Sequence, residues 1–165
     1  NPWNVIILVD ESGSMMDSVI YSAVMASIFA KLPFLSVQLA IFDTALVDLS
    51  EHIDDPVGIL LKVQLGGGTD IHGALEYAKK IMSFPHKTIV VLVSDLCDGN
   101  DYKLMYRSAA DIIESGAKLF VLPALDYEAA GAYDKNAARH IRGQGAEVAA
   151  ITPEALADWV GKVIG

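Results

Sequence analysis

The chain has very little cysteine and a shortage of basic residues. Cys97 is the only cysteine among 165 residues. A disulfide within the chain is therefore excluded, and so is a zinc site built from several thiolates of one chain. Lys and Arg total 12 against 21 Asp and Glu, which gives a formal net charge of -9. This charge would repel a phosphate backbone, so we do not expect a nucleic-acid partner.

No hydrophobic run is long enough to cross a membrane. The most apolar stretch, residues 19–30, contains Ser22 and Ser27 and is closed by Lys31. A membrane-spanning helix needs roughly 20 apolar residues, so this stretch predicts a buried helix. The chain opens with Asn1 and has no basic leader or cleavage site, which leads us to expect a piece of a longer protein.

Hydrophobic residues are abundant, at 53% of the chain. With 165 residues, such a chain can bury a core without disulfides, so we expect a single domain over residues 1–165. Short β-branched runs alternate along the chain with segments that have a 3.6-residue apolar stripe. The runs predict strands at residues 5–9, 37–42, 46–49, 88–93, 119–122 and 147–151, the second and third of them as a hairpin.

Helix signals fill the gaps between these strands. Apolar stripes predict helices around residues 16–28, 71–82, 105–113 and 152–163. Asn100 or Asp101 is expected to cap the third helix, and Thr152 followed by Pro153 is a start signal for the last. Alternating strands and helices indicate an α/β fold: a doubly wound, mostly parallel sheet with helices on both faces.

Hydroxyl and carboxylate side chains follow the first buried strand in the run Asp10-Glu11-Ser12-Gly13-Ser14. In extended backbone, side chains two residues apart point the same way, so Asp10, Ser12 and Ser14 can converge while Glu11 points elsewhere. Gly13 allows a tight turn.

Two further segments carry oxygen ligands. Thr69 follows three glycines and precedes a predicted helix, and Asp95 follows the second buried strand. If the strands that end at Asp10 and Asp95 are neighbours, these groups flank the crevice where ligands bind in doubly wound sheets. An all-oxygen set suits Mg²⁺, with Mn²⁺ as the alternative ion, better than zinc or copper. We therefore expect a metal site made by Asp10, Ser12, Ser14, Thr69 and Asp95.

Together, the three segments resemble the metal-ion-dependent adhesion site of von Willebrand factor A (VWA) domains. That family's Asp-x-Ser-x-Ser, Thr and Asp match Asp10, Ser12, Ser14, Thr69 and Asp95 in order. The resemblance implies a six-stranded sheet with one short antiparallel edge strand. It also implies a non-catalytic, Mg²⁺-dependent protein-binding module, in which a Glu or Asp of the partner completes the coordination.

The residues of these motifs are more similar to those of bacterial intracellular VWA proteins than to those of integrins. This resemblance implies a cytoplasmic location and a role beside a MoxR-type AAA ATPase, in complex assembly or metal-cofactor insertion. Cys97 and Asp98 depart from the family's usual Asp-Gly ending after the second strand, which puts the shape of that loop in doubt.

Two enzymatic functions are alternatives to this hypothesis. A magnesium phosphotransferase of the haloacid-dehalogenase type would use Asp10 as its nucleophile, but that family has a second Asp where this chain has Ser12. A serine hydrolase would use Ser12 or Ser14, but the chain has no Gly-x-Ser-x-Gly elbow there.

Residues around the expected metal site have more ordinary interpretations. Asp70 is expected to cap a helix or support the ligands, and His72 to be structural rather than a ligand. Cys97 is expected to be semi-buried, with a pKa that nearby acids raise. Tyr102 and Tyr106 are candidates for the rim of a partner-binding surface.

Overall fold

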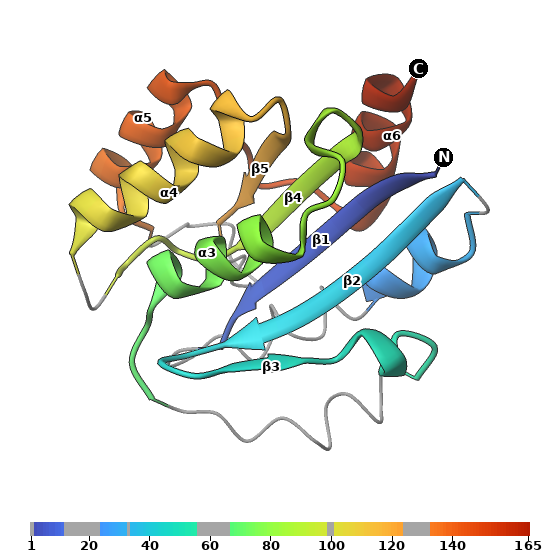
Figure 1. The fold of residues 1–165 in the computed structure, drawn as a ribbon, viewed down its shortest axis with the longest axis horizontal. Helices are drawn as coiled ribbons and strands as arrows, with labels where there is room; N and C mark the ends of the chain where they lie inside the picture. The colour runs from blue at the N-terminus through green and yellow to red at the C-terminus, as the bar shows by residue number, and fades with distance from the viewer. Residues whose placement is uncertain (1, 12–23, 33, 56–66, 99–100, 124–132) are drawn as a thin grey trace.

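The fold is a single twisted sheet with helices on both faces, as Figure 1 shows. The structure is a computed structural model that describes residues 2–11, 24–32, 34–55, 67–98, 101–123 and 133–165. Within these ranges the sheet has six strands in the order β3-β2-β1-β4-β5-β6. The strands are β1 (Trp3–Asp10), β2 (Leu35–Phe42), β3 (Leu46–Asp48), β4 (Thr88–Val93), β5 (Lys118–Leu122) and β6 (Glu147–Val148).

The direction in which the chain adds strands reverses at β1. All neighbouring pairs are parallel except β2 and β3, which form an antiparallel hairpin at one edge. β1 lies between β2 and β4, so the chain winds to one side of β1 first and then to the other. In doubly wound sheets, ligands bind at such a reversal, beyond the carboxyl ends of the strands.

The helices form two layers, one on each face of the sheet. One layer holds α3 (Ile71–Ile81), α4 (Tyr102–Glu114) and α5 (Lys135–Gln144). The other holds the helical residues 24–30 and α6 (Pro153–Ile164). Short 3-10 turns, η1 (Ser50–His52) and η2 (Pro85–Lys87), complete the described elements. Within the described residues, no helix combines the length and the apolar character needed to cross a membrane.

The strand residues divide between two cores because side chains alternate across a sheet. In β1, Ile6 and Leu8 pack under α3, α4 and α5, whereas Val5, Ile7 and Val9 pack under the opposite layer. Burial on both faces explains the uninterrupted apolar runs of the central strands.

Acidic side chains begin several of the helices. Asp70, Asp101 and Asp134 cap α3, α4 and α5, each accepting a hydrogen bond from a backbone N–H of the first turn. Thr152 caps α6 in the same way. The predicted caps Asp70, Asp101 and Thr152 are therefore confirmed.

The predicted fold class is confirmed, with local differences. α5 was not among the predicted helices, because its buried stripe consists only of Ala137, Ala138 and Ile141. β6 begins at Glu147 as predicted but ends at Val148, three residues before the predicted end of that strand. The first predicted helix is described only over residues 24–30. A single domain over residues 1–165 stays a prediction.

Candidate metal centre

The ends of β1 and β4 meet in a hydrogen bond between two fully buried side chains. The Ser94 hydroxyl donates to Asp10 Oδ2 across 2.7 Å, and neither residue has exposed surface. Asp10 is the last residue of β1, and Ser94 directly follows β4. β1 and β4 pair in parallel, so both residues lie at the same end of the sheet. The condition set by the sequence, that the strands ending at Asp10 and Asp95 are neighbours, is met. We call this end of the sheet the carboxyl edge.

The loop after β4 holds Asp95 in place through several contacts. Asp95 Oδ1 accepts the Cys97 N–H at 3.0 Å, and the Asp95 carbonyl accepts the Asp134 N–H at 2.8 Å. The intervening Leu96 has a φ of 64° and a fully buried side chain. Its N–H donates to the same Ser94 hydroxyl that contacts Asp10. Asp95 is therefore fixed relative to Asp10 through one shared serine.

Thr69 reaches the carboxyl edge through Asp43, the residue that follows β2. The Asp43 carbonyl accepts the Asp70 N–H, and Asp43 Oδ2 accepts the Gly67 N–H, both at 3.0 Å. A Cβ at Gly67 would lie 2.9 Å from that oxygen, so a glycine is needed for this approach. Thr69 itself is buried. Asp43 is not among the site residues predicted from the sequence, although it follows a buried strand just as Asp10 does.

Glu11 adds a buried carboxyl group beside these acids. It is 7% exposed, and its Oε2 has no hydrogen-bond partner among the described residues. Burial, together with the charges of Asp43 and Asp10, raises the pKa of Glu11 to about 7. The sequence predicts that Glu11 points away from the ligand group, yet it lies within electrostatic range of Asp10. A cation at this edge would offset the repulsion among the three carboxyl groups.

The predicted ligand set is described only in part. Asp10, Thr69 and Asp95 lie at the carboxyl edge, whereas Ser12 and Ser14 lie outside the described residues. Within the described ranges, no three His, Cys, Asp or Glu side chains are grouped so that they alone could hold a metal ion. A metal site here therefore depends on hydroxyl ligands, which make up three of the five predicted side chains. Coordination by the five stays a prediction.

Comparison with known proteins identifies the family. A model of the VWA domain containing CoxE-like proteins matches residues 1–160. The chain belongs to this family. A curated relative, the uncharacterized protein YehP of Escherichia coli (strain K12), is 44% identical over 158 residues. That match covers 96% of this chain but only 42% of YehP, so the chain spans less than half of its relative's length.

Solved structures share the fold of this VWA domain at low sequence identity. An aerotolerance-related membrane protein from Bacteroides fragilis matches with a TM-score of 0.72 and 14% identity, covering 98% of each chain. The SpRpn10 VWA domain matches with a TM-score of 0.66 and 12% identity, covering 93% of this chain and 89% of its own. VWA domains are generally non-enzymatic interaction modules, and membership therefore indicates a protein-interaction module.

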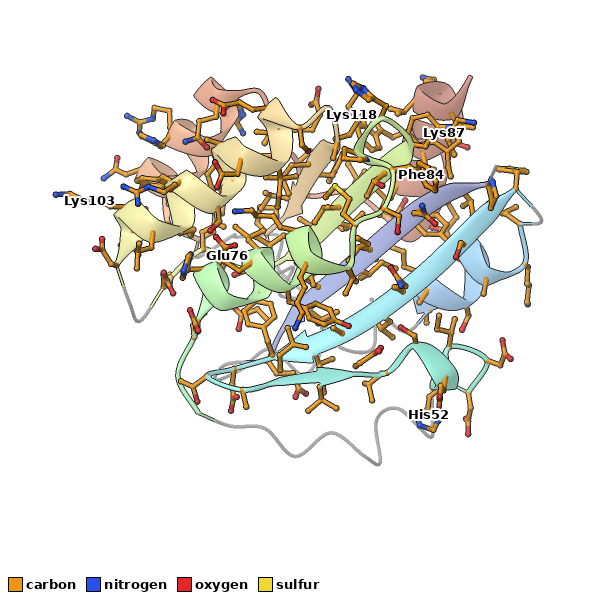
Figure 2. The ribbon with its side chains drawn as sticks, in the orientation of Figure 1. His52, Glu76, Phe84, Lys87, Lys103 and Lys118 are labelled. Carbon is orange, nitrogen blue, oxygen red and sulfur yellow. The ribbon has the colours of Figure 1, made fainter. Side chains whose placement is uncertain are left out.

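His72 of this VWA domain belongs to a polar network between α3 and α4. The Ser108 hydroxyl donates to Glu76 Oε1 at 2.9 Å, so its oxygen accepts the proton of His72 Nδ1, 2.7 Å away. Glu76 also pairs with Lys79, which reaches Asp111 on α4 at 2.7 Å. Figure 2 labels Glu76 on α3, at the side facing α4. His72 thus has a structural role, as the sequence predicts.

Cys97 and the two tyrosines lie beside the loop after β4. Cys97 is exposed, so the prediction of a semi-buried side chain was wrong. Its pKa is raised by partial desolvation and by the charges of Asp95 and Asp134, in the predicted direction. The Tyr102 hydroxyl donates to Asp134 Oδ2 at 2.8 Å, and Tyr106 stacks on His140 with ring centroids 3.7 Å apart.

Proposed function

We propose that this VWA domain binds a partner protein through a divalent cation at the carboxyl edge. Asp10, Ser12, Ser14, Thr69 and Asp95 would hold Mg²⁺, or Mn²⁺ in its place, and a Glu or Asp of the partner would complete the coordination. The observation that carries the proposal is the buried Ser94–Asp10 hydrogen bond at the strand reversal, with Glu11 buried beside it. A bound cation supplies a Lewis-acidic position for an outside carboxylate.

Residues of the chain would orient the ligands before a partner arrives. The Ser94 hydroxyl holds one oxygen of Asp10, and the Cys97 N–H holds one oxygen of Asp95. Outer hydrogen bonds of this kind fix the orientation of metal-binding carboxylates. Asp43 does the same for the segment that carries Thr69 by accepting the Gly67 N–H. The three described ligand positions are thus held by contacts that do not need the ion.

The partner is proposed from the family resemblance. Motifs similar to those of bacterial intracellular VWA proteins favour a cytoplasmic MoxR-type AAA ATPase, acting in complex assembly or metal-cofactor insertion. No observation favours the phosphotransferase alternative, which would make Asp10 a nucleophile. In the structure, Asp10 is buried and hydrogen-bonded to Ser94.

Metal titration of matched variants tests the proposal. We expect Mg²⁺ or Mn²⁺ binding, measured by calorimetry, to weaken at least about tenfold in Thr69→Ala and Asp95→Asn, as removal of a ligand or its orienting partner does. Asp101→Asn is the control, because Asp101 is also a helix-capping aspartate but caps α4 outside the predicted set. Thermal unfolding of each variant shows whether the fold is retained. Unchanged titrations in both ligand variants would refute the metal centre.

A pull-down from lysate of the cell that makes the protein tests the second half of the proposal. A true partner is retained by the wild-type domain in Mg²⁺ and is lost both in EDTA and with Asp95→Asn. A partner retained equally in all conditions would show that binding does not use the metal.

A further inference from the structure

A pocket of about 170 Å³ opens between the β2–β3 turn and the first turn of α3. Apolar and acidic residues both line it, among them Phe42, Leu46 and Ala74 on the one hand and Asp43 and Asp70 on the other. Figure 1 shows the end of β2 and the start of α3 at the same end of the sheet. The pocket adjoins the candidate metal centre, because Asp70 directly follows Thr69 and its N–H bonds to Asp43.

The two carboxylates are held by backbone contacts. Asp43 Oδ1 accepts the Ala45 N–H at 2.7 Å, and Asp70 Oδ1 accepts the Gly73 N–H at 3.0 Å. The contact with the Gly73 N–H positions the Asp70 carboxylate without supplying a positive charge. Among the described residues, no lysine or arginine forms a salt bridge with Asp70. An ionised carboxylate has about four acceptor positions, so Asp70 retains capacity for further donors.

An apolar surface combined with acidic groups suits a long cationic side chain. The methylene stem of lysine or arginine packs on apolar surface while its charged end bonds to a carboxylate. A purely apolar side chain would desolvate the Asp70 carboxylate without giving it a further donor, which is unfavourable. An acidic side chain would be repelled by both aspartates.

We propose that this pocket accepts a lysine or arginine side chain of the partner protein. The partner's recognition segment would then carry an acid for the metal centre and a base for the pocket. The pairing of an acid with a base in one recognition segment rests on the proposed function, whereas the preference of the pocket for a cation does not. This gives the surface a specificity element beyond the metal itself.

Titration with small amino-acid probes tests the pocket directly. We would record amide NMR spectra of the ¹⁵N-labelled domain with N-acetyl-arginine methylamide, the lysine analogue and the uncharged norleucine analogue, at constant ionic strength. We expect the arginine and lysine probes to shift the amides of Thr44, Ala45 and Gly73, and norleucine to bind more weakly.

A matched pair of variants separates charge from structure. Asparagine caps helices about as well as aspartate, so Asp70→Asn removes one of the two acidic charges that line the pocket while keeping the cap of α3. We expect this substitution to weaken the affinity for the arginine probe by up to about fivefold, as for the loss of a partly exposed ion pair. Asp101→Asn, the equivalent change at α4, should leave probe binding unchanged.

Running the titration in Mg²⁺, in EDTA and with Asp95→Asn keeps the two proposals apart. The pocket proposal holds if Asp95→Asn loses Mg²⁺ but still binds the arginine probe at Thr44 and Ala45. It is overturned if norleucine binds equally well, or if the shifts centre on Asp95 and Cys97. It is also overturned if the same amides shift on dilution of the protein alone, which would assign the pocket to a second copy of the chain.

Discussion

The two ends of the same strands differ in what they bury. At the carboxyl edge, Asp10 and Ser94 have no exposed surface and Glu11 is 7% exposed. At the opposite end, which we call the amino edge, Phe34 precedes β2 and is 47% exposed, and Phe84 precedes β4 and is 57% exposed. Figure 2 shows Phe84, Lys87 and Lys118 together at this end, near the chain termini. Acidic groups are thus buried at one edge and aromatic groups exposed at the other.

Part of this difference follows from helix direction. α3, α4 and α5 begin at the carboxyl edge with capping aspartates, and α3 and α6 carry lysines in their last turns at the amino edge. Acids at helix starts and bases at helix ends complement the helix dipole, so these charges have a structural cause. No such cause explains the burial of Asp10 and Glu11. The buried acids, rather than the capping acids, therefore distinguish the candidate metal centre.

The largest expected contrast is between the aromatic residues of the two edges. Phe42, the last residue of β2, is 1% exposed, so Phe42→Ala should reduce the free energy of unfolding by about 3–5 kcal/mol. Phe84→Ala should change it by less than about 0.5 kcal/mol, because Phe84 is largely in solvent. Urea denaturation of both variants measures the contrast. A large loss for Phe84→Ala would show that the amino edge is packed rather than exposed.

A smaller effect is expected at the cap of α5. Asp134→Ala should reduce the free energy of unfolding at neutral pH by about 1–2 kcal/mol, since both the cap to Ala137 and the acceptor for Tyr102 are lost. The Ala137 N–H and the Tyr102 hydroxyl lower the pKa of Asp134. A carboxylate with a depressed folded pKa stabilises the fold above its ordinary pKa and loses that contribution as the pH falls.

The difference between wild type and Asp134→Ala should therefore narrow in acid. Denaturation at a series of pH values from neutral to acidic checks this dependence. Asp134→Asn can still cap α5, so its free energy of unfolding should fall less than that of the alanine variant. A gap that stays constant down to strongly acidic pH would contradict the role assigned to the carboxylate.

The smallest effect concerns the lysines of the amino edge. Lys87 and Lys118 are both exposed. Lys87 directly precedes β4, whose other end lies at the candidate metal centre, and Lys118 begins the neighbouring strand β5. Exposed charges are largely screened beyond about 10 Å at 0.1 M salt. Lys87→Gln and Lys118→Gln should accordingly change Mg²⁺ affinity less than about twofold, measured by calorimetry. A larger change would show that the two edges are electrostatically coupled.

The sequence predicts the regular part of this molecule better than its loops. β4 appears over its full predicted range, because five consecutive buried apolar residues after Thr88 are typical of a central strand covered on both faces. α5 was missed since alanines give a weak apolar stripe. Glu11 and Asp43 were missed for a different reason. Alternation along one strand predicts which side chains share a face, but the contact of Asp43 with Gly67 joins residues 24 positions apart.

Leu96 makes the loop after β4 dependent on the core beneath it. Left-handed backbone costs a residue with a side chain about 1–2 kcal/mol, whereas full burial of a leucine stabilises by about 1.5–3 kcal/mol. The conformation therefore persists only while the leucine remains among the core residues that also include Leu75 and Met105. A change of side-chain volume in that layer would then displace Asp95 without touching it. The position of one candidate ligand is in this sense set from inside the molecule, by the packing of helices that do not themselves contribute to the proposed metal centre.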